Sequence, residues 1–405
     1  MQETTPHPPV PGADQSAEPP ESAAVPVRRV AFLDVARALA MIGVVMMNAP
    51  IVVFAAERAG ERTESTLTAV VDAALNLLMS GNARSMLMVL LGVGVVLAWR
   101  AAEKRGGRPM VLMLWRYAVL GVVFGVPHLL VFSGDILTLY SVSALLLAPA
   151  LPLLLGGSRA RPFWSAVALF AAAPALEYFV GQGNELLFLV AMVPQTLAFF
   201  CLGVWLARRP ELSPDFEGPT SLPVRMIWAG LLIKPLGFVL MFGSDWLFPM
   251  EFDAEGIPVL GADGLPVVDP GSHALVSLGA SLAGLGGALL YLGLVWWLVR
   301  RGRAASRVLG TLAPLGRMTL TVYLLSTAVF LCTKPLEGEI TLLAQYGLAA
   351  AYFAVMILVA RWWMGAFRLG PLEWVWRSIV RRRPLPLRRR TGAGQETEKA
   401  HTGIG

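Results

Sequence analysis

The stretch GVPHLLVFSGDILTLY, residues 125–140, joins two long apolar runs through a short polar turn. Apolar residues fill about 110–132 before the turn and about 136–155 after it. A helix needs about 20 apolar residues to cross the roughly 30 Å hydrocarbon core of a bilayer. Two such runs, joined through Ser133 and Gly134, predict a hairpin of two antiparallel membrane helices.

The rest of the chain repeats this pattern. Its 405 residues are 56% hydrophobic and only 15% charged, whereas a soluble domain carries about 25% charged residues. The composition therefore excludes an ordinary soluble globule and predicts an all-α integral membrane protein with about ten transmembrane helices. The ten runs lie at about 30–54, 82–99, 110–132, 136–155, 163–180, 186–206, 225–247, 274–299, 308–332 and 340–361. A shorter apolar stretch, 66–80, predicts an interfacial or re-entrant helix.

The distribution of charge predicts how the helices cross the membrane. The net charge is +6, and the arginines and lysines gather between alternate apolar runs rather than in one nucleic-acid-binding module. By the positive-inside rule, both termini then lie in the cytoplasm and the partner of the chain is the lipid bilayer.

Three regions follow from composition. Residues 1–27, rich in Pro and Glu, predict a disordered cytoplasmic leader. Residues 28–383 form the polytopic membrane domain, and 384–405 predict a basic, disordered cytoplasmic tail. The outer loop 248–270 has five acids and no base, and we expect either a plain connector or a hairpin that covers an outer cavity.

Polar groups near the outer face are the first candidates for function. An ionisable side chain within a membrane segment costs about 3 kcal/mol or more and usually faces the bundle interior. His128, Asp135 and Arg84 are such residues, and the polar Asn48 lies at the same depth. Asp135 opens a helix, where an acid can simply cap it. The hairpin also brings His128 and Asp135 close, and a carboxylate can orient an imidazole as a general base.

Other polar groups lie deeper or at the inner face. Asp34 and Arg37 are three residues apart and can pair locally on one helix face. With Arg317 they predict a cationic pocket for a cytoplasmic anion. Gln195 and Lys234 sit at mid-depth beside prolines and predict a polar site between interrupted helices, as in transporters. The series GASLAGLGG, residues 279–287, predicts close helix packing. The spacing of His, Cys and acids predicts no metal site and no bound cofactor.

Five segments together resemble the YeiB-like family of bacterial inner-membrane proteins. They are LDVARALAMIGVVMMN, RSMLMVLLGVG, PHLLVFSGDILTLY, GRMTLTVYLLS and GPLEWVWR, in this order. The resemblance runs from about Asp34 to Arg377, and it implies a multi-pass protein of the bacterial cell membrane. The C-terminal region of the family, about 225–380 here, is a domain of unknown function.

The family also looks related to transmembrane acyltransferases, which take an acyl group from cytosolic acyl-CoA and deliver it across the membrane. The resemblance implies His128 and Asp135 as catalytic residues. It implies binding roles for a further set of residues, and Glu373 is part of the family pattern without an assigned role. Val322 and Leu325 stand where the family has an asparagine and a glutamine, so two polar groups are missing from the expected cavity. The binding set is Asp34, Arg37, Asn48, Arg84, Tyr140, Arg317 and Tyr323.

Three functions remain open from the sequence. The first is transfer of an acyl group, with acyl-CoA as the donor substrate, to an acceptor at the outer face. The second is transport of a small solute or a lipid-linked precursor. The third is a non-catalytic accessory role in the membrane.

Overall fold

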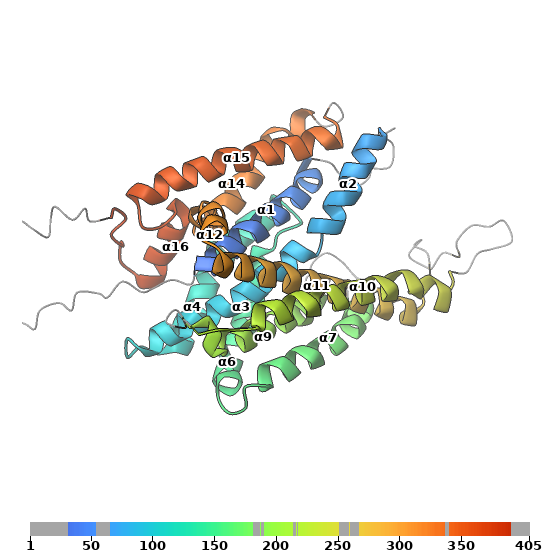
Figure 1. Ribbon diagram of the computed structural model, residues 1–405, viewed down its shortest axis with the longest axis horizontal. Helices are drawn as coiled ribbons and strands as arrows, with labels where there is room; N and C mark the ends of the chain where they lie inside the picture. Colours follow the sequence, from blue (N-terminus) through green and yellow to red (C-terminus); the bar gives the residue numbers. More distant parts are fainter. Residues whose placement is uncertain are drawn as a thin grey trace, which may run out of the picture.

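The computed structural model describes residues 31–53, 65–180, 187, 190–213, 216, 218–250, 259, 267–336 and 340–389. Helices are the regular elements of these residues (Figure 1), and a single antiparallel bridge joins Phe367 to Arg388. The all-α class is therefore confirmed. The first half contains α1 (Ala31–Val53), α2 (Thr66–Met79), α3 (Asn82–Glu103), α4 (Pro109–Val119), the π-helical segment η2 (Leu120–Gly125), α5 (Val126–Leu129), α6 (Leu137–Leu155), α7 (Arg161–Val180) and α9 (Val193–Ala207). The second half contains α10 (Leu222–Leu247), α11 (Pro270–Arg301), α12 (Arg303–Gly310), α13 (Ala313–Gly316), α14 (Thr319–Cys332), α15 (Leu342–Ala366) and α16 (Pro371–Arg381).

The first helix, α1, is the centre of the bundle. It packs against α3 and α11 on one side and against α13, α14 and α15 on the other, and Figure 1 shows it between these two groups. Ala36, Ala38 and Ala40 are completely buried, because small side chains let the neighbouring helices approach closely. The helix that follows the leader therefore holds both halves of the chain together.

Seven helices are long and apolar enough to cross a membrane among the residues that the structure describes. Each of the ten expected runs contains helical residues, but α7, α9 and α14 are not among the seven. The helices α9 and α14 contain 15 and 14 residues, which at about 1.5 Å per residue span less than the hydrocarbon core. The structure thus supports a membrane protein without confirming the count of ten.

The run 308–332, expected as one span, is divided into α12, α13 and α14. Pro314 opens the short helix α13, and α14 begins only at Thr319. Arg317 therefore occupies the break before α14.

The stretch 66–80 is the helix α2, which a tight turn at Ser80 and Gly81 connects to α3. Together they make one long apolar segment, Thr66–Glu103. The polar residues of α2 attach this helix to α15. Asp72 Oδ1 accepts a hydrogen bond from the hydroxyl of Tyr346 on α15 at 2.6 Å, and a second from Asn76 Nδ2 on α2 itself at 2.9 Å. This polarity therefore has a packing role within the bundle.

The helices α10 and α11 form a close pair through small residues. A Cβ on Gly237 would meet the carbonyl oxygen of Gly279 at 2.6 Å, and a Cβ on Gly286 would collide with the backbone nitrogen of Lys234. The packing role predicted for the series 279–287 is confirmed. The helix α10 continues through Pro235, so the expected interruption of this span is not observed.

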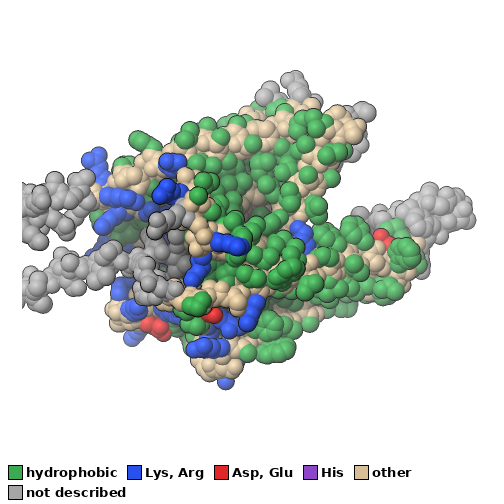
Figure 2. Space-filling view, in the orientation of Figure 1, with side chains coloured by type: hydrophobic (Ala, Val, Ile, Leu, Met, Phe, Trp, Pro, Cys, Tyr) green, Lys and Arg blue, Asp and Glu red, His purple; other side chains and the backbone are tan. Residues whose placement is uncertain are grey.

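The face of the bundle that Figure 2 shows is largely apolar. Figure 2 shows a largely hydrophobic face, with Lys and Arg gathered at the end where α16 and α12 lie. Large side chains such as Trp246, which is 90% exposed, and Leu358 point outward. Contiguous apolar surface of this extent is typical of a protein that contacts lipid.

The predicted leader and most of the predicted outer loop lie outside the described residues. Part of the predicted tail is described and is not free of contacts. The backbone N–H of Arg368 donates to the carbonyl oxygen of Leu387 at 2.9 Å, and the backbone N–H of Arg389 donates to the carbonyl oxygen of Ala366 at 3.0 Å. The first residues of the predicted tail thus fold back on the end of α15.

Replacing Gly286 with Ala should destabilise the protein. The added methyl group would overpack the α10–α11 contact, at a cost of about 1–3 kcal/mol in the free energy of unfolding. Thermal unfolding of the purified protein in detergent measures the effect. Gly243→Ala on α10 is the matched control, because a Cβ there meets nothing within 4 Å. Equal unfolding temperatures for the two variants would contradict the packing described here.

Candidate functional site

The hairpin of residues 125–140 brings His128 and Asp135 into direct contact, as predicted. Nδ1 of His128 lies 2.7 Å from Oδ1 of Asp135. Both residues are buried, with exposures of 6% and 3%. A buried imidazole and carboxylate in direct contact fix the orientation of the ring.

The carboxylate of Asp135 also caps helix α6. Its Oδ1 accepts the backbone N–H of Leu137 at 3.0 Å, and its Oδ2 accepts that of Thr138 at 2.7 Å. The capping role and the pairing with His128 thus coexist. Because both backbone partners are donors, Asp135 acts as an acceptor, and Nδ1 of His128 is the atom that donates to it.

The second nitrogen of His128 contacts a hydroxyl from a distant part of the chain. Nε2 lies 3.0 Å from Oγ1 of Thr327, a residue of α14 that is 3% exposed. In the neutral imidazole with Nδ1 as the donor, Nε2 is the acceptor for this hydroxyl. A carboxylate that orients an imidazole, which in turn contacts a hydroxyl, is typical of sites in which a general base activates a nucleophile or an acceptor. Sequence reasoning missed Thr327, because a threonine in an apolar run carries no local signal.

A π-helical turn and a glycine place His128. The segment η2 comes directly before α5, which carries His128, and π-helical turns occur frequently at functional sites. Gly125 packs tightly on α6, since a Cβ there would meet Thr138 Oγ1 at 2.8 Å and its backbone nitrogen at 3.0 Å. This close approach sets the distance between the two arms of the hairpin.

Other predicted site residues surround the pair. The ring of Tyr323 lies 4.9 Å from that of His128, and its hydroxyl oxygen accepts the N–H of Ile136 at 3.4 Å. The side chain of Asn48 is a neighbour of Tyr323. The structure thus brings His128, Asp135, Tyr323 and Asn48 together from α5, the turn before α6, α14 and α1.

Several buried polar atoms around the pair have no hydrogen-bond partner among the described residues. They include Nδ2 of Asn48, Oγ1 of Thr138 and the hydroxyl of Tyr140. Most buried polar groups in proteins are paired. Unpaired donors and acceptors beside an oriented imidazole are therefore suited to bind a polar group of a substrate.

Arg84 and Gln195 belong to a second polar chain. Nη2 of Arg84 donates to Oε1 of Gln195 at 3.1 Å, and Nε2 of Gln195 donates to the hydroxyl of Ser281 at 2.8 Å. This chain connects α3, α9 and α11. Arg84 and Asp135 are the charged neighbours of Tyr140, so Tyr140 lies between this chain and the His128–Asp135 pair.

Lys234 does not join Gln195 in a mid-membrane site. Its Nζ donates to the carbonyl oxygen of Leu77 at 2.8 Å, at the C-terminal end of α2. Asn82 and the hydroxyl of Tyr291 also donate to carbonyls of this last turn. A cation and amide donors at a helix C-terminus satisfy its free carbonyls. Lys234 therefore holds the end of α2.

The predicted inner group lies in one region but apart from His128. Arg37 and Asp34 pair at 3.1 Å, as their spacing predicted. Gly316 packs directly against the backbone of Asp34, which brings the neighbouring Arg317 to this end of α1. Arg37 and Asn48 are 11 residues apart on α1, a separation of about 16 Å along the axis. The inner and outer groups are therefore two distinct clusters.

Glu373 has a structural role that its sequence position alone did not indicate. Its Oε1 accepts the backbone N–H groups of Leu320 at 2.7 Å and Thr321 at 3.2 Å, and its Oε2 lies 2.6 Å from the hydroxyl of Thr321. Burial raises the pKa of Glu373, against the opposing effect of these hydrogen bonds. Glu373 of α16 thus caps the N-terminus of α14, the helix that carries Tyr323 and Thr327.

The two departures from the family pattern have different surroundings. Val322 is completely buried, and its carbonyl oxygen accepts the hydroxyl of Tyr352 at 2.6 Å. Leu325 is 41% exposed, so its side chain is not enclosed in the core around His128. The structure therefore places Val322 in the core and Leu325 at a partly exposed position. Among the described residues, no group of three or more His, Cys, Asp or Glu could hold a metal ion.

A known protein-family model matches the C-terminal part of the chain. Residues 259–383 match the family model described as a protein of unknown function, DUF418. The DUF418 match begins later than the expected family region, and it covers α11 to α16. It therefore includes Tyr323, Thr327 and Glu373, while His128 and Asp135 come before it.

Two Bacillus proteins are similar over most of the chain. An uncharacterized 39.9 kDa protein from the amylase 3′ region of Bacillus acidopullulyticus is 25% identical over 366 residues, covering 89% of this chain and 96% of the relative. The uncharacterized protein YxaH of Bacillus subtilis (strain 168) is 25% identical over 338 residues, covering 75% of this chain and 80% of the relative. No solved structure matches.

Replacing Glu373 with Ala should destabilise the protein, because Leu320 and Thr321 would lose the acceptor for their buried N–H groups, at about 1–3 kcal/mol each. Glu373→Gln is the matched control, since its amide oxygen can still accept both bonds. In detergent, the unfolding temperature should be highest for wild type, lower for Glu373→Gln and lowest for Glu373→Ala. An Ala variant as stable as wild type would refute the capping role.

Proposed function

We propose that the protein is a membrane-bound acyltransferase in which His128 is the general base and Asp135 orients it. The observation that carries this proposal is that His128 contacts Asp135 through one ring nitrogen and Thr327 through the other. Nδ1 lies 2.7 Å from Oδ1 of Asp135, and Nε2 lies 3.0 Å from Oγ1 of Thr327. Such a carboxylate, imidazole and hydroxyl arrangement removes a proton from a hydroxyl or an amine.

The hydroxyl of Thr327 marks the position where the acceptor binds. In the reaction, the acceptor's hydroxyl or amine gives a proton to Nε2 of His128 as its oxygen or nitrogen attacks the thioester carbonyl. The carbon–sulfur bond then breaks, and the thiol takes the proton back from His128. The unpaired polar atoms of Asn48, Thr138 and Tyr140 are available to hold the acceptor.

The donor in this proposal is acyl-CoA from the cytoplasmic side. Arg37 and Arg317 lie at the end of α1 opposite to Asn48, and guanidinium groups suit phosphates. The two clusters are about 16 Å apart along α1, so the thioester arm of the donor must extend along the bundle to reach His128. This need for a long, extended donor favours a substrate that carries its acyl group on a flexible arm.

Transport is the alternative function, and the proteoliposome experiment described below distinguishes it from acyl transfer. The sequence features that favoured it were interrupted spans around Gln195 and Lys234. The structure gives Lys234 a bond to Leu77 and gives Gln195 bonds to Arg84 and Ser281, and α10 is continuous. These contacts account for both residues without a transport site.

His128→Ala should abolish acyl transfer in proteoliposomes supplied with acetyl-CoA and glucosamine as an amine and hydroxyl probe. Loss of the general base lowers the rate by about 10²–10⁴-fold. Release of free CoA thiol and the mass of the acylated product measure the reaction. Thr327→Val should stay within about tenfold of wild type, because the acceptor and not Thr327 loses the proton.

His273→Ala is the matched control, since His273 stands near the start of α11 and packs on Tyr178 outside the cluster. Full transfer activity in a correctly inserted His128→Ala protein would overturn the proposal. Vesicles that accumulate unmodified probe without releasing CoA would favour transport instead.

A further inference from the structure

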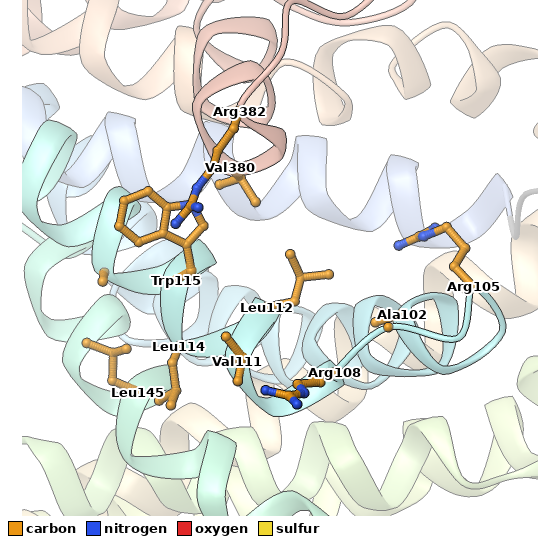
Figure 3. A pocket seen from close by; sticks show the side chains of 12 residues that line it. Ala102, Arg105, Arg108, Val111, Leu112, Leu114, Trp115, Leu145, Val380 and Arg382 are labelled. Atoms are coloured by element: carbon orange, nitrogen blue, oxygen red, sulfur yellow. The ribbon is translucent and has the colours of Figure 1, made fainter.

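A cavity of about 700 Å³ lies at the basic end of the bundle, away from the His128 cluster. It opens between the α3–α4 connection, α4, α6 and the end of α16, and Figure 3 shows its lining. The volume falls in the range of small-molecule sites. None of the residues proposed for acyl transfer lines it, so it needs its own explanation.

The rim of the cavity is cationic. Arg105, Arg108 and Arg382 line it, and in Figure 3 they surround the opening from different sides. Within the described part of the chain no carboxylate lines the cavity or pairs with these three arginines. Three guanidinium groups around one opening, without acids, favour an anion with several oxygen atoms.

More cations stand directly behind this rim. The pKa of Arg381, on α16, is lowered first by burial and then by the charges of Arg105, Arg383 and Arg116. Positive groups this close repel one another unless an anion lies between them. The crowding therefore points to the same kind of ligand as the rim does.

The wall of the cavity is apolar. Leu112 and Trp115 of α4 and Val380 of α16 face it, and the guanidinium of Arg382 lies 5.3 Å from the ring of Trp115. A free inorganic anion needs no such wall. An anion attached to a hydrocarbon chain would place its charge at the rim and its chain along these side chains.

The backbone at Arg382 supports a functional position. Arg382 is the one non-glycine residue with a positive φ among the described residues, at 53°. It ends α16 in the left-handed conformation that glycine usually occupies. A glycine would cap the helix with less strain, but it could not place a guanidinium over Trp115.

We propose that this cavity binds an anionic phospholipid, with the phosphate between Arg105, Arg108 and Arg382 and an acyl chain against Leu112, Trp115 and Val380. The lipid comes from the leaflet at the basic end of the bundle, which the positive-inside rule assigns to the cytoplasm. Basic pockets between membrane helices on this side commonly bind lipid head groups.

Native mass spectrometry of the full-length protein with added phosphatidylglycerol or phosphatidylcholine tests the site. Wild type should bind phosphatidylglycerol at least about tenfold more tightly than phosphatidylcholine, because both lipids carry a phosphate but the choline cation of phosphatidylcholine is repelled by the three arginines. The variant Arg105→Gln/Arg108→Gln/Arg382→Gly should lose this preference. The control Arg159→Gln/Arg161→Gln/Arg225→Gln removes the same charge from the same end and should keep it.

The single variant Arg382→Gly separates binding from folding. Its unfolding temperature should equal or exceed that of wild type, because glycine relieves the left-handed backbone, while its affinity for phosphatidylglycerol falls. Equal lipid binding by the pocket variant and the control variant would overturn the proposal. Glycerol 3-phosphate binding as tightly as the lipid, or acetyl-CoA displacing the lipid, would also overturn it, since the occupant would then be a soluble anion.

Discussion

The buried contact between His128 and Asp135 is the interaction on which the outer half of the bundle depends. A carboxylate in a low-dielectric interior is costly unless donors surround it. Asp135 has three, namely Nδ1 of His128 and the backbone N–H groups of Leu137 and Thr138. The same carboxylate thus contacts His128 at the end of the first arm of the hairpin and caps α6 at the start of the second. It also fixes the imidazole ring that contacts Thr327 of α14.

Three other buried polar groups follow the same rule and have partners of their own. Lys234 closes the end of α2, Gln195 connects Arg84 to Ser281, and Glu373 caps α14. These contacts explain the residues by packing and helix capping alone. The cluster around His128 differs because polar atoms of Asn48 and Tyr140 remain unpaired beside it, and this difference is the reason for assigning the chemistry there.

Local sequence patterns predicted much of this arrangement. The apolar runs predicted the helices, the seven-residue spacing across the turn predicted the contact of His128 with Asp135, and the glycine series predicted the α10–α11 pair. Contacts between distant segments were not predictable in this way. Thr327 is 199 residues from His128, and the carbonyl bound by Lys234 belongs to α2. Pro314 is a local signal for the division of 308–332, but the docking of Gly316 against Asp34 of α1 is a distant contact that no local pattern reveals.

The most direct test of this account is ¹⁵N NMR of the histidine-labelled full chain in lipid nanodiscs. The chain has four histidines, and His128→Gln assigns the signals of His128. The account predicts a proton on Nδ1, an Nε2 signal that changes in Thr327→Val, and a change at both nitrogens in Asp135→Asn. A proton on Nε2, or a spectrum unchanged by Asp135→Asn, would contradict the arrangement on which the proposed chemistry rests.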